Sequence, residues 1–228
     1  MTERIVRHAP RLSPEIIEAY AGQEASTVYE AAGGVGGMDH TVRPIAWGQH
    51  MVGNALTVRC HPADNLMLHA AIAMAQPGDV IVAEVGGLVD AGYWGEITTV
   101  AAMARGVVGL VIDGGVRDRS AIVGHNFPIW SRALCMRATV KKTPGAINHP
   151  VVVGGVTVHP GDLVLGDDDG VVVVARERVN EVLEASQARA DNEAAVMERL
   201  RQGKLTLDLL GFRQTLTDLG ITIDAEEG

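Results

Sequence analysis

The chain has 228 residues, of which 47% are hydrophobic and 21% charged, so it is long enough for one sizeable core and has the composition of a globular protein. Its formal net charge of −9 and its lack of a lysine and arginine cluster argue against nucleic acid as a partner, because binding to phosphates needs such a cluster. No stretch approaches the roughly 18 uninterrupted apolar residues of a membrane span, and the first residues lack the apolar core of a signal peptide, so we expect a soluble, cytoplasmic protein without membrane contacts.

The amino-terminal half predicts helices that alternate with strands. Ser13-Pro14-Glu15 has the residue types of a helix start, namely a capping serine, a proline in the first turn and an acid near the positive helix end. This helix should run to about Tyr20, and the next segment begins as a strand or a short helix before it reaches the glycines at 33–38. The elements expected next are a strand over 54–62, a helix from 64 to the Pro77-Gly78 turn and a strand over 80–85.

The carboxyl-terminal half predicts a buried strand, several short strands and a helical end. A helix over 96–105 is closed by Gly106, and the apolar run after it predicts a fully buried strand that ends at Ile112. The remaining elements are a short helix over 120–126, a strand over 128–134, a meander of short strands over 151–175 and helices from Arg176 onward. We therefore expect one α/β domain over 1–228 with mixed sheets, in which 176–228 form a C-terminal helical arm that packs on its own domain or on a neighbouring subunit.

Arg117 and Asp118 follow the buried strand and a pair of glycines. Loops at the ends of strands in open α/β sheets are where ligands usually bind, and glycines allow the backbone to approach a ligand closely. Arg117 offers a planar fork that suits a carboxylate, and Asp118 offers oxygen ligands for Mg²⁺ or Mn²⁺. The alternative is a local ion pair on the surface after a tight turn.

Glu96 begins the predicted helix that precedes this strand. If the helix packs antiparallel to the strand, its first turn lies beside the carboxyl end of the strand. One point would then be surrounded by Glu96, the amides of Ile97 and Thr98, Arg117 and Asp118. The alternative is that Glu96 is only a favourable acid in the first turn of a helix.

Other polar and sulfur-containing groups favour structural roles. Cys60 and Cys135 lie in apolar segments, which predicts small buried residues in a reducing compartment. The acidic run 167–170 lies between two apolar runs and predicts a hairpin turn rather than a metal cluster. The glycines at 33–38 lack the ending of a phosphate-binding loop and predict a flexible loop at a pocket or an interface.

Several segments occur together in the order and at the spacing of one known family, namely DNLMLHAAI, GYWGEI, GLVIDGGVRD, FPIWSRA, GAINHPVVVGGVTVHPGDLVLGDDDGVVVV and LRQGKLTLDLL. On these segments the chain resembles the class II 4-hydroxy-4-methyl-2-oxoglutarate / 4-carboxy-4-hydroxy-2-oxoadipate aldolases, whose superfamily includes the regulator of ribonuclease E activity A. The resemblance spans roughly residues 25–220.

The resemblance implies an αββα-type sandwich like that of swivelling domains, assembled as a homotrimer or homohexamer with sites at subunit interfaces. It implies a divalent metal cofactor, Mg²⁺ or Mn²⁺. The implied reaction is retro-aldol cleavage of a branched 4-hydroxy-2-oxo diacid or triacid to pyruvate, with oxaloacetate decarboxylation as a side activity through the same pyruvate enolate.

The resemblance also implies roles for residues at the Arg-Asp pair and the helix start. Arg117 would hold the carboxylate and keto group of the pyruvyl unit, and Asp118 would bind the metal. The amides of Ile97 and Thr98 would donate hydrogen bonds to the pyruvyl unit. Glu96 would contact the water shell of the metal or the substrate.

Further residues would complete this pocket from elsewhere. Glu30 would be an acid delivered from the adjacent subunit. Glu193 would be the acid of the C-terminal arm that also crosses the interface, with Glu198 as a competitor. The remaining residues of the substrate-binding wall would be Gly95, Asn65 and His69.

Two departures from the family pattern concern the substrate. The family has an acid three residues after the aspartate of the Arg-Asp pair, and this chain has Ala121. Glu96 stands where the family usually has aspartate, and its extra methylene moves the carboxylate by roughly 1.5 Å. The physiological 2-oxo acid is therefore open, and a lyase or decarboxylase that acts on another 2-oxo acid is an alternative.

A second alternative is a protein-binding regulator of ribonuclease E without catalytic activity. A regulator of this kind would be expected to lose some of the acids of the site, whereas this chain keeps Glu30, Glu96, Asp118 and Glu193. The segments DNLMLHAAI, GYWGEI and GLVIDGGVRD contain no lysine that could form an imine, which favours metal-assisted chemistry over the imine route.

Overall fold

The structure is a computed structural model that describes residues 5–221. The described residues form two compact units, one that ends at Ser186 and one that begins at Gln187. All predicted pocket residues lie in the first unit, except Glu193 and its competitor Glu198. Within residues 5–221, no helix is both long and apolar enough to cross a membrane.

Short strands form most of the first unit. They are β1 (Arg43–Pro44), β2 (Met51–Arg59), β3 (Asp79–Glu84), β4 (Gly92–Trp94), β5 (Gly109–Val116), β6 (Ile129–Leu134), β7 (Ala146–Ile147), β8 (Val151–Val153), β9 (Val156–Val158), β10 (Leu163–Gly166) and β11 (Val171–Val174). The main sheet has the order β1-β6-β5-β3-β2-β10-β11, with β4 paired to β5 and β7 paired to β2. Its central strands are parallel, whereas β1, β7, β10 and β11 pair antiparallel with their neighbours. Strands β8 and β9 pair antiparallel and form a separate sheet.

The helices follow the sequence pattern closely. They are α1 (Pro14–Tyr20), α2 (Ala25–Ala31), α3 (Leu66–Met74), α4 (Glu96–Met103), α5 (Arg119–Gly124), α6 (Val179–Arg201), α7 (Thr206–Leu209) and α8 (Phe212–Asp218), with a 3₁₀ turn at Arg176–Arg178 before α6. Ser13 precedes α1 as predicted, although its hydroxyl makes no capping hydrogen bond. In the second unit, the remainder of α6 ends near Gly203, which has a φ of +83°, and α7 and α8 follow.

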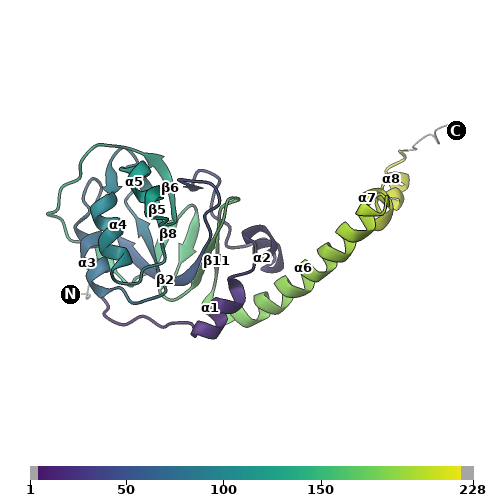
Figure 1. Cartoon of the computed structure of the whole chain (residues 1–228), viewed down its shortest axis with the longest axis horizontal. Helices are drawn as coiled ribbons and strands as arrows, with labels where there is room; N and C mark the ends of the chain where they lie inside the picture. Colours follow the sequence, from purple (N-terminus) through teal and green to yellow (C-terminus); the bar gives the residue numbers. More distant parts are fainter. Residues whose placement is uncertain (1–4, 222–228) are drawn as a thin grey trace. The chain divides into compact units, whose positions relative to one another are not determined.

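Helices and a hairpin cover opposite faces of the main sheet. Because alternate residues of a strand point to opposite faces, Ile81 of β3 packs in the cluster that includes α3, α4 and α5, whereas Val80 and Val82 pack in the cluster that includes β8 and β9. Figure 1 shows α3, α4 and α5 side by side on the sheet. The helices α1, α2 and the start of α6 pack in a third cluster with β10 and β11. The predicted fold class, mixed α/β with a long C-terminal helix, is confirmed.

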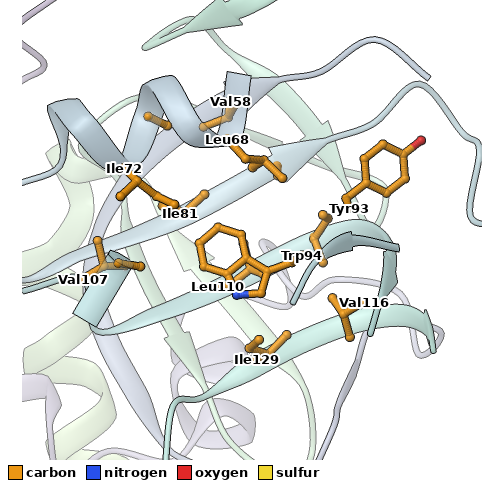
Figure 2. Packing of buried hydrophobic residues seen from close by; sticks show 14 of the residues in the cluster. Val58, Leu68, Ile72, Ile81, Tyr93, Trp94, Val107, Leu110, Val116 and Ile129 are labelled. Atoms are coloured by element: carbon orange, nitrogen blue, oxygen red, sulfur yellow. The ribbon is translucent and has the colours of Figure 1, made fainter. Parts of the chain in front are cut away.

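Trp94 lies in the core beside the start of α4. Its side chain is fully buried, stacks on Phe127 with 6.2 Å between ring centroids, and donates its indole N–H to Thr99 Oγ1 at 2.7 Å. Figure 2 shows Trp94 next to Leu110 of β5, with Leu68 and other residues of α3 directed at the sheet. The segment before α4 is therefore fixed by apolar packing and not by loop contacts alone.

The strand β5 extends further than the sequence predicts. It does not end at Ile112 but continues through Gly114 and Gly115 to Val116. The reason is β4, a buried strand that pairs with this extension, with Gly92 opposite Gly115. A Cβ at Gly115 would lie only 2.6 Å from the Ala91 carbonyl oxygen. The glycines thus allow β4 to lie against β5.

The segment before α1 lies at the amino ends of the parallel strands. The Leu12 amide donates to Asn54 Oδ1 at 2.7 Å, and the Arg11 guanidinium pairs with Asp79, the first residue of β3. The Arg11 side chain also donates to the Pro77 carbonyl at 2.8 Å. This segment therefore lies at the end of the sheet opposite to the carboxyl end of β5.

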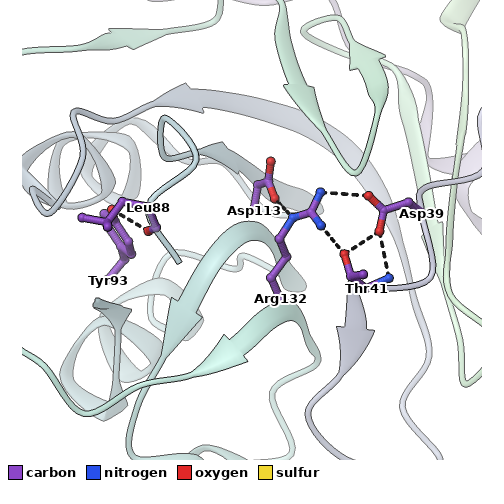
Figure 3. A network of polar contacts seen from close by, with 6 residues as sticks. All are labelled: Asp39, Thr41, Leu88, Tyr93, Asp113 and Arg132. Atoms are coloured by element: carbon purple, nitrogen blue, oxygen red, sulfur yellow. Dashed lines mark hydrogen bonds and ion pairs between the residues drawn. The ribbon is translucent and has the colours of Figure 1, made fainter. Parts of the chain in front are cut away.

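Arg132 of β6 joins three parts of the first unit. Its guanidinium pairs with Asp113 of β5, bonds to Thr41 and pairs with Asp39 at 2.8 Å between Nη2 and Oδ2. Figure 3 shows this network, and beside it the Tyr93 hydroxyl that donates to the Leu88 carbonyl at 3.0 Å. The loop before β1 is thereby tied to the centre of the sheet.

Acid should weaken the contribution of Asp39 to stability. Hydrogen bonds from the Thr41 hydroxyl and amide, helped by Arg132, lower the pKa of Asp39 to about 2. Its stabilisation is present above its unfolded-state pKa near 4 and is lost as the pH falls toward 2. Because the Asp39 side chain is 40% exposed, the effect should be below about 1 kcal/mol. In urea unfolding, the difference between wild type and Asp39→Asn should shrink from pH 6 to pH 3, and a constant difference would contradict this account.

The two cysteines are free, in agreement with the prediction. Cys60 is buried, and burial raises its pKa to about 12. Cys135 is only half-buried, contrary to the prediction, because it follows β6 at the end of the sheet. The acidic run 167–170 forms the predicted turn between β10 and β11, with the Asp167 amide donating to the Gly170 carbonyl at 3.0 Å.

Candidate functional site

Arg117 and Asp118 lie at the carboxyl end of β5, directly beside the start of α4. The amide of Arg117 donates to the Trp94 carbonyl at 2.9 Å, and the amide of Glu96 donates to Asp118 Oδ2 at 3.1 Å. Asp118 precedes α5 with a left-handed φ of +58°, yet its carboxylate makes no capping bond to α5 and instead receives the first amide of α4. The predicted packing of this helix start against the end of the strand is confirmed.

Gly95 leaves the space that the Asp118 carboxylate occupies. A Cβ at position 95 would overlap Asp118 Oδ2 and would lie 3.2 Å from both Cγ and Nε of Arg117. Gly92 is similar, since a Cβ there would lie 3.3 Å from Arg117 Cδ and would overlap the Cys135 carbonyl oxygen. The glycines around the pair are therefore required by its close approach to β4 and α4.

The first turn of α4 offers backbone donors next to this pair. Thr98 Oγ1 accepts from the Gly95 amide at 3.0 Å and donates to the Gly95 carbonyl at 2.8 Å, which fixes the turn. The first N–H groups of a helix have no partner within the helix. The amides of Ile97 and Thr98 can therefore donate to a ligand, as a helix start commonly does to an anion.

One open pocket brings most of the predicted residues together. Its empty volume is about 570 Å³. Its lining comes from the start of α3, from β4 and α4, from the Arg-Asp pair and from the loop after β6, and comprises Asn65, His69, Gly92, Tyr93, Trp94, Gly95, Ile97, Thr98, Arg117, Asp118, Ala138, Thr139 and Lys141.

The charges and polar atoms of the pocket favour an anion that also carries a hydrogen-bond donor. Two positively charged side chains, Arg117 and Lys141, line the pocket, and Asp118 supplies the one carboxylate among its lining residues. Asn65 is 6% exposed, and its Nδ2 donates to the Tyr93 carbonyl at 2.8 Å. Its Oδ1 is buried without a hydrogen-bond partner. Since an unsatisfied buried oxygen is costly, a ligand hydroxyl or a water at Asn65 would be stabilising.

His69 should be neutral at physiological pH. Burial, followed by the positive charge of Lys141, lowers its pKa below the ordinary value of 6.5. Replacement of Lys141 by Met should remove the second cause and raise the pKa of His69 part of the way back, because burial remains. An NMR titration of the imidazole C2 proton in wild type and Lys141→Met measures this change. An equal or lower pKa in the variant would show that Lys141 does not act on His69.

The side chain of Glu96 does not line the pocket. Its backbone amide contacts Asp118, but its carboxylate oxygen Oε1 lies 3.1 Å from Nε2 of His125, the residue that follows α5. Both side chains are partly exposed, 50% for Glu96 and 36% for His125. The longer side chain at this position thus reaches the far end of α5.

Neither of the two acids expected from a neighbouring subunit is among the residues that line this pocket. Glu30 is an exposed residue of α2, a helix that packs on β11, and is not part of the pocket lining. Glu193 belongs to the second unit, where it pairs with Arg189 at 2.8 Å, and Glu198 accepts a bond from Gln202. Their contribution to a site stays a prediction about an assembly of chains.

The pocket contains no preformed metal centre, but the Asp118 carboxylate could serve as one ligand of a divalent cation. Within residues 5–221, no three His, Cys, Asp or Glu side chains come together to hold a metal. Asp118 Oδ1, however, has no hydrogen bond among the described residues. Mg²⁺ is commonly held by one or two carboxylates, several waters and oxygens of the substrate. Asp118 together with waters and the oxygens of a chelating ligand would match that donor set.

The loop after β6 supplies lining residues that the sequence pattern could not assign. Ala138 and Thr139 were not predicted as pocket residues, and Lys141 lines the pocket beside them. This loop has no periodic pattern because it contains no helix or long strand. Asp64 holds it in place, since its Oδ2 accepts from the amides of Lys142 and Thr143 at 2.7 Å. The signal in the sequence that could have indicated this contact was Asp64, an acid two residues before the start of α3.

Comparisons with known proteins agree on one family. Residues 14–173 match the RraA-like family model described as Aldolase/RraA. The chain is 37% identical over 168 residues, covering 73% of this chain and 80% of the relative, to a protein of Halalkalibacterium halodurans that bears the provisional name 4-hydroxy-4-methyl-2-oxoglutarate aldolase. It is 34% identical over 173 residues, covering 75% of this chain and 83% of the relative, to an uncharacterized protein of Methanocaldococcus jannaschii.

Solved structures show the same fold. An uncharacterized protein from Pseudomonas syringae superposes with a TM-score of 0.76 at 28% identity, covering 86% of this chain and 96% of that one. The Streptomyces coelicolor protein RraAS2, described as an unusual member of the RNase ES inhibitor RraA protein family, superposes with a TM-score of 0.76 at 26% identity, covering 82% and 98%.

Proposed function

This chain belongs to the RraA-like Aldolase/RraA family, and on this premise we propose that it is a metal-dependent carbon–carbon lyase. The proposed reaction is retro-aldol cleavage of a branched 4-hydroxy-2-oxo diacid or triacid, of the 4-hydroxy-4-methyl-2-oxoglutarate type, to pyruvate. Oxaloacetate decarboxylation is the proposed side activity, because it passes through the same pyruvate enolate. The relative named as an aldolase supports the substrate class.

One observation carries this proposal, namely that Asp118 accepts the first amide of α4 at 3.1 Å while Arg117 lies beside it. The guanidinium, the carboxylate and the free amides of Ile97 and Thr98 thereby line a single pocket. A 2-oxo acid has a carboxylate and an adjacent keto oxygen. The planar Arg117 guanidinium can pair with the carboxylate, and several N–H donors of the pocket can bond to the keto oxygen.

The residues of this chain act by binding and by stabilising charge. Breaking the C3–C4 bond leaves negative charge on the oxygen of the pyruvate enolate, and Arg117 with the amides of Ile97 and Thr98 would stabilise that charge where it develops. Asn65 Oδ1, buried and unpartnered, would accept the hydrogen bond of the C4 hydroxyl and orient it. Lys141, which also lines the pocket, would attract a distal carboxylate.

Asp118 would hold the divalent cation, and Glu96 and Glu193 are the further acids proposed to contact it. A cation bound there would supply Lewis-acid stabilisation of the 2-oxo oxygen. Glu193 lies in the second unit, and its proposed role is that of an acid delivered across a subunit interface. The proposal therefore includes a homotrimer or homohexamer with sites at the interfaces and with Glu30 as a second contribution of the neighbouring chain.

Removal of divalent metal should abolish the activity. Pyruvate release from 4-hydroxy-4-methyl-2-oxoglutarate and from oxaloacetate should fall to background in EDTA and return with excess Mg²⁺ or Mn²⁺. Borohydride added with pyruvate should leave the chain unmodified, which tests Lys141 as an imine-forming residue. Full activity in EDTA would contradict the metal, and absence of pyruvate from both substrates with metal present would contradict the lyase.

A non-catalytic regulator of ribonuclease E is the second candidate. The observation in its favour is the superposition on RraAS2, whose family is described as inhibiting an RNase E-type enzyme. Such a protein needs a docking surface and no reactive pocket. Co-purification with a ribonuclease E, tested beside pyruvate release on the same sample, separates the two, since the proposed lyase should release pyruvate and need not bind the ribonuclease.

A further inference from the structure

The carboxylate of Glu96 contacts His125 and does not line the pocket. Its backbone lies at Asp118, at the amino end of α5, whereas its Oε1 contacts His125 just beyond the carboxyl end. The Glu96 carboxylate therefore contacts His125, and only the Glu96 backbone contacts the pocket residue Asp118.

The surroundings of His125 suit this contact. Ala121 is four residues before His125, so both lie on one face of α5, and the small side chain at 121 leaves that face open. The peptide N–H of His125 donates to the Ala121 carbonyl at 3.1 Å, which fixes the backbone position of the histidine. Without a side-chain donor here, the Glu96 carboxylate would have no partner among the described residues.

We propose that His125 is a positioning residue that holds the Glu96 carboxylate outside the cation-free pocket, so that Asp118 is the one carboxylate that lines the pocket until Glu96 is released toward a cation. This inference deepens the proposed function, on which it rests. A glutamate that follows Gly95 and is freed from His125 has enough length to turn back toward Asp118. An aspartate at the same position would be too short to reach His125.

The contact would set the charge balance of the pocket. With Glu96 held on His125, Arg117 and Lys141 outweigh Asp118, and an anionic ligand is favoured. With Glu96 released, a second carboxylate at the rim would favour a divalent cation and oppose a free anion. Loss of His125 should therefore change the two affinities in opposite directions, which loss of local structure would not do.

The test measures binding of Mn²⁺ alone, by electron paramagnetic resonance, and of pyruvate alone, by calorimetry without metal. His125→Ala should bind Mn²⁺ about tenfold more tightly than wild type, since affinity in such sites rises with the number of ligand charges. It should bind pyruvate about threefold more weakly because of the added negative charge. His125→Gln, which keeps an N–H donor near the same place, should restore both values toward wild type.

A double-mutant comparison identifies the partner. In a Glu96→Gln background, His125→Ala should change neither affinity, because no carboxylate is left to release. His8→Ala is the matched control for loss of an exposed histidine, since His8 belongs to the segment that lies at the opposite end of the sheet. Thermal unfolding of each variant checks that the first unit keeps its stability.

Unchanged or weaker Mn²⁺ binding in His125→Ala overturns the proposal, as does an equal gain in the Glu96→Gln background. The proposed function is judged separately, by pyruvate release from wild type. A wild-type protein that releases no pyruvate, combined with tighter Mn²⁺ binding in His125→Ala, would contradict the lyase and support the positioning role.

Discussion

Replacement of Arg117 by Ala should lower kcat/KM for pyruvate release by about 10³-fold while the protein stays folded. Loss of one preorganised donor to a developing oxyanion costs about 10²–10³ in rate, and Arg117 is also the proposed anchor of the substrate carboxylate. The stability should change little. The guanidinium is 42% exposed, and its ion pair with Asp118, at 3.7 Å, is a surface pair worth at most about 1 kcal/mol.

A matched control is available at Arg176. It also pairs with the acid that follows it, Glu177, at 2.6 Å, and its side chain is 35% exposed. Arg176→Ala should therefore have the same small effect on unfolding and no effect on pyruvate release. Arg117→Lys keeps the charge and loses the planar fork, so it should fall between wild type and Arg117→Ala. Activity in Arg117→Ala within a few-fold of wild type would remove Arg117 from the mechanism.

Addition of a single methyl group at Gly95 should lower pyruvate release by about 10²-fold, although position 95 carries no functional side chain. The backbone there is extended, with φ −154°, and accepts alanine without strain. The new Cβ would overlap Asp118 Oδ2, so the carboxylate must leave its bond with the Glu96 amide. Small displacements of catalytic groups have effects of about this size, and overpacking costs about 1–3 kcal/mol of folding stability.

Gly22→Ala separates this effect from a general intolerance of glycine replacement. A Cβ at Gly22 meets nothing within 4 Å, so activity and stability should be unchanged. Asp118→Asn provides the second comparison, because Gly95→Ala acts through the Asp118 carboxylate and should cause little further loss once that carboxylate is gone. Full additivity of the two losses would show that Gly95 matters for another reason.

Local patterns predicted most of the fold. The helix α4 was readable from its apolar spacing, its acidic first residue and Gly106, which has a φ of +75° at the predicted end. The apolar run predicted the strand β5, but it did not predict where this strand ends. Glycines normally mark turns, and only the pairing of β4 with β5 keeps Gly114 and Gly115 in a strand.

The candidate site was predictable to the extent that it depends on one helix and one strand. The packing of the first turn of α4 against Asp118 follows from the antiparallel arrangement of α4 and β5. Lys141 could not be placed, because an irregular loop held by Asp64 brings it there. The direction of the Glu96 side chain was equally hidden, since the sequence gives no sign that His125 lies within its reach.

The pairing of β4 with β5 also determines when the pocket can exist during folding. Gly95 and Arg117 are far apart along the chain and meet only after α4 has crossed between two parallel strands. No partly unfolded form that lacks this pairing can retain the pocket. Ligands of the pocket should therefore bind only the native state and raise the free energy of global unfolding in proportion to the logarithm of their concentration. Hydrogen exchange of the β4 and β5 amides should slow with ligand to the same degree as that of the innermost strands, β2 and β3.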